Sequence, residues 1–228
     1  MIRAASDELF WNNPVFHDRL WEATLETVLM MVCTTIVVAA IGLPLGVLLH
    51  ATSEKGLTPQ AAVYRVVSLI VDFGRSIPFI ILMIALIPFT RFVVGSALGW
   101  EATVVPLAVG AIPFFARLVQ NALREVEHGK VEAVQMMGAS KRHITVHVLI
   151  REALPAIVGA LTVTVVTLIG YTAMAGTIGG GGLGALAIDY GYRRYQTDTM
   201  LACIVLLVLL VALAQWIGDR AVKKLDHR

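Results

Sequence analysis

One stretch of this chain, VEAVQMMGASKRHITVHVLIREALP at residues 131–155, is the longest polar interruption in an otherwise lipid-like sequence. The residues from Glu132 to Met137 favour a helix, Gly138 ends it, and Ser140 offers an N-cap for a second helix. The pattern predicts a helix-glycine-helix elbow that faces water. Between two membrane spans, such an elbow gives a partner protein a rigid feature to hold, with a glycine where another backbone packs closely.

The same stretch permits a second interpretation, an amphipathic helix that lies on the membrane surface without a partner. Its basic side chains would then meet lipid headgroups. Shape alone leaves the two interpretations about equally supported. The basic and titratable side chains concerned are Lys141, Arg142, His143, His147 and Arg151.

The composition places the rest of the chain in a bilayer. Its 228 residues are 57% hydrophobic and 15% charged, and the mean hydropathy of +0.78 is far outside the range of a soluble domain of this size. The net charge is only +2 and the basic residues are spread among loops, which disfavours a nucleic-acid partner. We therefore expect an all-α integral membrane protein surrounded by membrane lipid.

Five apolar runs are interpreted as membrane spans, since about 20 apolar residues suffice to cross a bilayer. The second run is interrupted by prolines, and Asp72 and Arg75 near its start could form an i,i+3 ion pair. Residues 1–22 carry aromatic and scattered charged side chains, which favours an interfacial helix over a cleavable signal. Residues 23–228 then form one transmembrane domain. Its expected spans are about 23–49, 66–92, 104–119, 155–175 and 199–217, with a polar loop at 124–154.

The arrangement of basic residues predicts the orientation. With five spans, thirteen of the eighteen Lys and Arg residues fall on the side of the 124–154 loop. The positive-inside rule makes that side cytoplasmic. The N-terminus is then expected outside, and the C-terminus with its basic tail in the cytoplasm.

Two features near the fourth span are candidates for a solute path or a gate. Thr164, Thr167 and Tyr171 are spaced at i, i+3 and i+7, and this polar stripe either lines a path or makes only interhelical hydrogen bonds. The following glycine cluster lacks the Lys-Ser or Lys-Thr of a phosphate loop, so we reject nucleotide binding and expect close backbone packing at an outer gate. The candidate path or gate residues are Thr164, Thr167, Tyr171, Met174, Gly180 and Gly181.

The sequence offers no catalytic constellation. It contains no recognisable catalytic triad, paired carboxylates or Walker-type loop, so we expect a non-catalytic chain without a cofactor of its own. The six histidines have no cysteine or carboxylate partners at ligand spacing, and no metal site is expected. Cys33 and Cys203 lie in apolar runs, where we interpret them as small buried hydrophobes.

The residue identities of the elbow point to a family. Glu and Ala, then Gly-Ala-Ser, then an apolar run closing on a proline resemble the EAA loop of permease subunits from bacterial ABC importers. The second alanine of that motif is Val134 here, and Leu154-Pro155 falls four residues late. We expect Glu132 near the N-terminus of its helix, where the dipole favours a carboxylate. The candidate residues for coupling to an ATPase are Glu132, Ala133, Gly138, Ala139 and Ser140.

The resemblance extends from about Leu20 to the C-terminus, and it is closest to methionine importer permeases. It is carried by FGRSIPFIILMIALIPFTRFVVG at 73–95, VPLAVGAIPFFARLVQNAL at 105–123 and GYTAMAGTIGGGGLG at 170–184. It implies a membrane-spanning subunit of an ATP-driven importer for L- and D-methionine in the bacterial inner membrane. It also implies a second copy of this chain, a methionine-binding lipoprotein or periplasmic protein, and two separate ATPase subunits that bind ATP and magnesium.

A homodimer is also expected from the elbow itself, since one elbow per chain offers one docking site and two ATPase subunits need two. Two alternatives stay open at this point. The cargo could be another small amino acid or a peptide. A self-sufficient channel or ion-coupled carrier is a weaker alternative, because such carriers commonly contain inverted repeats and five spans do not divide into equal halves.

Overall fold

The computed structural model describes residues 19–226, and every regular element in that range is helical. The predicted all-α fold is therefore confirmed for the described part of the chain. Among residues 19–226, four helices are long and apolar enough to cross a membrane, and a fifth span is counted if a bent helix pair is taken as one. The interfacial helix expected at residues 1–22 lies outside the described residues up to Asp18.

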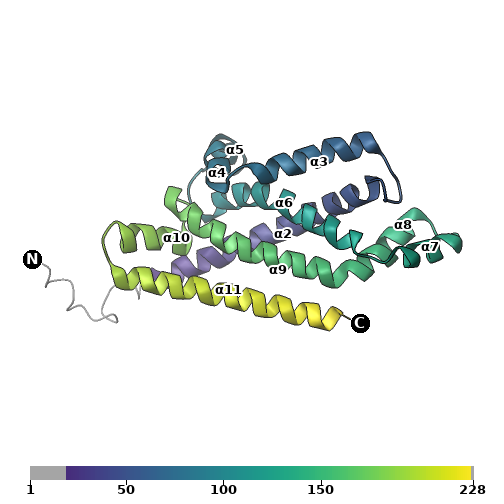
Figure 1. Ribbon diagram of the computed structural model, residues 1–228. Coiled ribbons are helices and arrows are strands. Elements are labelled where there is room, and N and C mark those ends of the chain that lie inside the picture. Colours follow the sequence, from purple (N-terminus) through teal and green to yellow (C-terminus); the bar gives the residue numbers. More distant parts are fainter. Residues whose placement is uncertain (1–18, 227–228) are drawn as a thin grey trace, which may run out of the picture. The chain divides into compact units, whose positions relative to one another are not determined.

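The long helices extend past the spans expected from hydropathy at nearly every end, because polar and aromatic residues continue them. They are α2 (Leu20–Thr52), α6 (Trp100–Arg124), α9 (Ile150–Ala175) and α11 (Thr197–Leu225) (Figure 1). The short helices are α3 (Ala61–Ser76), α4 (Phe79–Ala85), α5 (Ile87–Val94), α7 (His128–Met136), α8 (Lys141–His143) and α10 (Gly182–Leu186). Two π-helical segments, Ile144–Leu149 and Ala187–Tyr192, and a 3-10 turn, Gly176–Ile178, complete the regular structure of residues 19–226.

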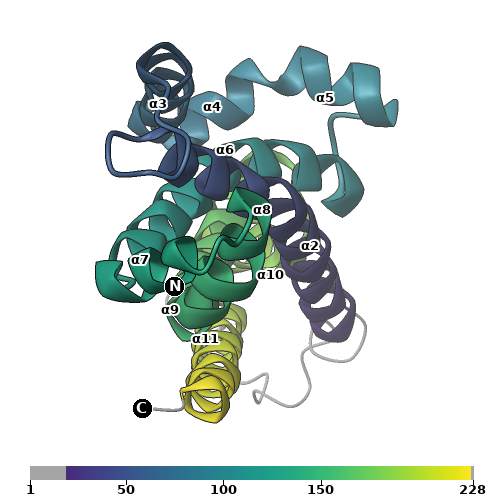
Figure 2. The same cartoon turned by 90° about the vertical axis from the view of Figure 1, so that its right-hand side faces the viewer.

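The second apolar run forms three short helices instead of one continuous helix. Proline disfavours helical geometry in the residue before it, and Ile77 before Pro78 is accordingly extended, with φ −80° and ψ 125°. Helix α3 therefore ends at Ser76 and α4 begins at Phe79. Figure 2 shows α4 and α5 as separate helices, and Pro88 lies in the first turn of α5, where a missing N–H costs nothing.

The described residues form two compact units, each built from segments far apart in the sequence. Unit 1 combines the chain up to Thr34 with Phe79–Leu107 and Thr167–Leu213. Unit 2 combines Thr35–Pro78, Ala108–Val166 and the chain from Ala214 onward. The four long helices contribute residues to both units.

The core of unit 1 packs the first turns of α2 against α10 and α11. Ala23, Leu183, Leu186 and Cys203 are buried together in one apolar cluster. Close van der Waals packing of these side chains stabilises the cluster, because lipid tails are as apolar as leucine and burial alone gains little. Both cysteines are free thiols, and Cys203 is fully buried, as interpreted, whereas Cys33 is only half-buried.

In unit 2, α2 packs closely on α6. A β-carbon at Gly46 would lie 2.6 Å from the carbonyl oxygen of Ala116 and 2.6 Å from Cβ of Val119, so only glycine permits this approach. The neighbouring Pro44 does not break α2, which continues to Thr52. The helix thereby brings its last turns next to the elbow that follows α6.

Candidate functional site

The predicted helix-glycine-helix elbow is present. Helix α7 ends at Met136, and Gly138 has a left-handed φ of +81° and donates its N–H to the carbonyl oxygen of Gln135 at 2.9 Å. The hydroxyl of Ser140 accepts the N–H of His143 at 3.3 Å and so caps α8, as the sequence indicated. A β-carbon at Gly138 would meet no atom of this chain within 4 Å. Nothing among the described residues therefore fills the space beside this glycine.

Glu132 does not lie near the N-terminus of its helix, which corrects the expectation above. Helix α7 begins at His128, so Glu132 is in its middle, beyond the reach of the N-terminal dipole. Its Oε1 lies 3.3 Å from Nε2 of His128, one turn earlier, and 62% of its side chain is exposed. Ala133, Gly138 and Ser140 are also exposed, and Ala139 is half-buried. The candidate coupling residues thus form a largely solvent-facing set.

The inner side of the elbow is attached to the rest of unit 2. Val131, Ile144 and Leu149 are buried, with at most 7% of any of them exposed. Helices α7 and α8 pack against the π-helical segment between α8 and α9 (Figure 1). Lys130 Nζ and Glu152 Oε2 form an ion pair at 2.6 Å that ties α7 to the start of α9. These contacts hold the elbow in one orientation.

The outer side of the elbow carries two exposed methionines that sequence reasoning counted only as helix formers. Met136 is 90% exposed and Met137 is 76% exposed. Methionine is flexible and polarisable, and it is common on surfaces that bind partner proteins. The polar residues around them could have indicated this role. Two adjacent apolar side chains in a water-facing loop are not buried in the bilayer, so a partner protein is the alternative.

The polar stripe predicted on the fourth span is divided between the two units. Thr164 belongs to unit 2 and is 1% exposed, and its hydroxyl donates to the carbonyl oxygen of Ala160 on its own helix at 2.8 Å. Tyr171 belongs to unit 1, where its ring stacks on Phe79 with centroids 4.2 Å apart. Thr167, also in unit 1, is half-buried, and Met174 is exposed. Thr164 and Tyr171 therefore each already have a partner within their own unit.

The glycine loop, residues 176–182, is held by side chains from α2 and α6 within unit 1. The carboxylate of Glu26 accepts the N–H of Gly182 at 2.7 Å, and the hydroxyl of Thr27 accepts the N–H of Leu183 at 2.9 Å. From α6, the hydroxyl of Thr103 donates to the carbonyl oxygen of Gly180 at 3.2 Å. Three side chains thus fix the backbone of a segment that has few side chains of its own.

The close fit around Gly181 explains why glycine occupies it. Its φ is +78°, and a β-carbon there would lie 2.8 Å from Oε2 of Glu26. A β-carbon at Gly180 would lie 2.7 Å from the carbonyl oxygen of Ala175. Valine at these two positions would therefore disrupt the folded conformation of the glycine loop, whether or not the loop moves during transport.

A polar network that runs from an exposed carboxylate to a buried amide in unit 2 replaces the simple ion pair expected in the second span. Asp72 does contact Arg75, at 3.7 Å, but its closer partner is Arg117 of α6, at 2.6 Å. The guanidinium also donates to Ser68 at 2.9 Å and to Gln120 at 2.6 Å. Because Gln120 is fully buried, this network links α3 to the interior of α6.

Within residues 19–226, no group of three or more His, Cys, Asp or Glu side chains is placed to hold a metal ion. His143 and His147 stack with ring centroids 4.4 Å apart on an exposed helical face. The contacts that the structure shows at the elbow and the glycine loop are hydrogen bonds, ion pairs and apolar packing.

Comparison with known proteins gives one family. The model of the "Binding-protein-dependent transport system inner membrane component" family matches residues 42–227. A probable D-methionine transport system permease protein from Vibrio cholerae is 48% identical over 92% of this chain and 94% of its own length. A methionine import system permease protein from Bacillus subtilis is 44% identical over 92% of this chain and 94% of its own.

The fold also matches a solved structure over nearly its full length. The crystal form is described as an inward-facing conformation of the MetNI methionine ABC transporter. A chain in it is 46% identical to the present one, with a TM-score of 0.92 over 94% of this chain and 99% of that chain.

Proposed function

The chain belongs to the family of binding-protein-dependent transport system inner membrane components, and on that basis we infer that it is the permease subunit of a methionine ABC importer. The observation that carries this inference is the length of the match, since both relatives and the solved structure cover more than nine tenths of the chain. As a permease, it is a non-catalytic, multi-pass protein of the inner membrane. Hydrolysis of ATP belongs to a separate subunit.

We propose that the elbow is where that ATPase docks. Its inner side is fixed to unit 2 by Val131, Ile144 and the Lys130–Glu152 pair, whereas its outer side presents Met136 and Met137 to water. When the ATPase moves, it displaces the exposed side of the elbow. That displacement reaches α9 only because the inner side of the elbow is firmly attached to it. In this proposal ATP and magnesium bind to the ATPase, and closure of the ATPase pair changes access through the spans.

The assembly we propose contains two copies of this chain, two ATPase subunits and a methionine-binding lipoprotein or periplasmic protein. Two copies follow from one elbow per chain. Ala156 is exposed and Gly159 half-buried, and small residues let helices of two chains approach closely. Cysteines placed from Gly159 to Tyr171 should crosslink between copies, and a monomeric mass in membranes without any crosslink contradicts the dimer.

We propose an orientation with the N-terminus outside and the elbow and C-terminus in the cytoplasm. The first turns of α2 hold the glycine loop through Glu26 and Thr27, so the loop lies on the same side as the start of α2. In this orientation the loop, with Gly180 and Gly181, borders the outer gate. Thr164, Thr167, Tyr171 and Met174 then follow on the span that leads inward from it.

Uptake of labelled methionine by vesicles tests the function. The vesicles contain this chain, its ATPase and its binding protein, and uptake is measured with ATP and with a non-hydrolysable analogue. We expect accumulation of both L- and D-methionine with ATP only. Uptake of a different amino acid or a peptide in place of methionine would overturn the cargo, and uptake without the ATPase would overturn the transporter class.

A further inference from the structure

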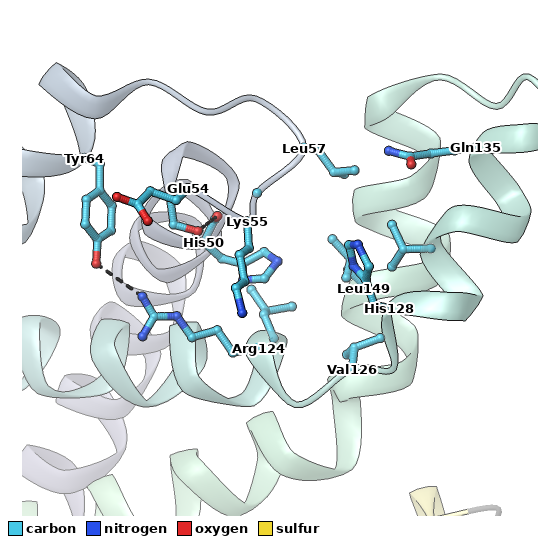
Figure 3. A pocket seen from close by; sticks show the side chains of 14 residues that line it. His50, Glu54, Lys55, Leu57, Tyr64, Arg124, Val126, His128, Gln135 and Leu149 are labelled. Atoms are coloured by element: carbon cyan, nitrogen blue, oxygen red, sulfur yellow. Dashed lines mark hydrogen bonds between the residues drawn. The ribbon is translucent and has the colours of Figure 1, made fainter.

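A large cavity lies in unit 2 beside the elbow and has a volume of about 1250 Å³. One side is made by the end of α2, the loop after it and the end of α6, and the other by α7 (Figure 3). This volume exceeds the roughly 300–1,000 Å³ typical of small-molecule sites, so the cavity can admit a charged group together with its water. The proposed docking of an ATPase assigns no role to it.

Its fixed charges favour an anion. Lys55 and Arg124 line the cavity, and neither has a carboxylate partner among residues 19–226. The one hydrogen bond of the Arg124 guanidinium goes to the Tyr64 hydroxyl at 3.2 Å, drawn as a dashed line in Figure 3. Glu54 supplies one carboxylate to the lining. Two cations against one carboxylate leave a positive field, and a guanidinium with free donors suits phosphate oxygens.

A residue with a buried, unpartnered nitrogen also lines this cavity. His50 is only 9% exposed, and its Nδ1 has no hydrogen-bond partner among the described residues. Buried polar atoms in proteins are nearly always satisfied by protein, water or a ligand. His128 and Gln135 lie on the opposite side, on α7 (Figure 3), and His128 Nε2 is 3.3 Å from the Glu132 carboxylate. A bound group with oxygen atoms would therefore find polar partners on both walls.

We propose that this cavity binds a phosphate group, and that the side chains of Lys55, Arg124 and His50 recognise it. The group comes either from the headgroup of an anionic phospholipid or from a soluble phosphate. The cavity lies at the polar ends of α2 and α6, where basic pockets beside membrane spans commonly hold lipid headgroups. Since α7 forms one wall, the bound group contacts the elbow and favours the position of α7 in which the walls face each other.

The test measures binding by the intact importer complex in nanodiscs. One set of discs contains phosphatidylcholine alone, and the other contains phosphatidylcholine mixed with phosphatidylglycerol. Retained lipid per permease is counted by native mass spectrometry, and binding of radiolabelled inorganic phosphate is measured on the phosphatidylcholine discs. The test variant is Lys55→Gln/Arg124→Gln. The matched control is Lys223→Gln/Lys224→Gln, which removes the same charge from two exposed residues of α11 that do not line the cavity.

We expect the parent and the control to retain phosphatidylglycerol. The test variant should retain at least about tenfold less, because loss of a charge-assisted hydrogen bond weakens binding by about that factor. Phosphate binding with the same dependence on these residues would identify a soluble phosphate as the source. Should the double variant fail to assemble, Lys55→Glu in the exposed loop gives the same test with one change. Equal binding of both probes by parent, test and control variants would overturn the proposal, whatever the cargo of the importer.

Discussion

The N–H of Gly182 donates a 2.7 Å hydrogen bond to the carboxylate of Glu26, so a residue near the start of the first span fixes a loop that follows the fourth. Glu26→Ala should therefore loosen the glycine loop. The expected loss in the free energy of unfolding is about 1–3 kcal/mol, the cost of leaving a buried donor unpaired. Thermal unfolding of the purified complex measures the loss, and methionine uptake should fall with it.

Glu22→Ala is the matched control for Glu26, because Glu22 is an exposed carboxylate one turn earlier on α2. We expect it to leave both stability and uptake unchanged. Glu26→Gln keeps an oxygen acceptor and should lie between the parent and Glu26→Ala. If Glu26→Ala and Glu22→Ala behave alike, the glycine loop does not depend on this contact.

Gly138→Leu should prevent the ATPase from co-purifying while the permease still inserts and folds. A side chain at φ +81° costs about 1 kcal/mol or more, but the leucine meets no atom of this chain nearby. Any larger effect must come from a collision with the partner. Gly95→Leu is the control, since Gly95 has φ +85° and equally open space but lies outside the elbow. Equal co-purification of the ATPase by both variants would contradict docking at Gly138.

Met136→Ser/Met137→Ser should also weaken ATPase binding, with little change in the stability of the permease. Both side chains are mostly exposed and so contribute little to folding. Loss of two apolar contacts at a docking surface is expected to lower affinity by about 1–3 kcal/mol. Titration of the ATPase against permease in nanodiscs measures the affinity. Val146→Ser, a half-exposed position on the adjoining π-helical segment, should have no such effect.

Lys130→Glu should lower the number of methionine molecules moved per ATP hydrolysed, with only a small loss in the stability of the chain. The Lys130 and Glu152 side chains are 44% and 38% exposed, and ion pairs of that kind stabilise proteins by about 1 kcal/mol or less. Their position matters more, because they attach α7 to α9. The ratio of methionine moved to ATP hydrolysed is the measurement. The charge-swapped variant Lys130→Glu/Glu152→Lys should recover most of this ratio. If it does not, the ion pair is not what attaches α7 to α9.

The parts of the elbow that the sequence predicted are those determined locally. Gly138 and Ser140 are a helix terminator and an N-cap, and each acts within four residues of the chain, so residue type and spacing sufficed. Glu132 was placed wrongly because the start of α7 lacks a strong signal: Glu127 occupies the cap position without a side-chain hydrogen bond. The outline of the spans followed from hydropathy for a similar reason, since a bilayer acts on every residue of a run alike.

The parts that the sequence did not reveal depend on partners far along the chain. Asp72 was paired with Arg75, three residues away, whereas the closer Arg117 is 45 residues away. Thr103 and Gly180, 77 residues apart, had no reason to be considered together. Met136 was classed by helix propensity, because its exposure is a property of the folded elbow and not of its neighbours in the sequence.

The contact between Glu26 and Gly182 also has a consequence for how the protein is made. The two residues are 156 positions apart, and at a translation rate of about 5–20 residues per second Gly182 leaves the ribosome roughly 8–30 s after Glu26. Throughout that interval the first span carries a carboxylate without its partner, and such a group enters a bilayer only at considerable cost. We therefore expect the start of the nascent span to stay at the membrane surface during this interval. Its final position is then expected only after the fourth span and the glycine loop have been synthesised.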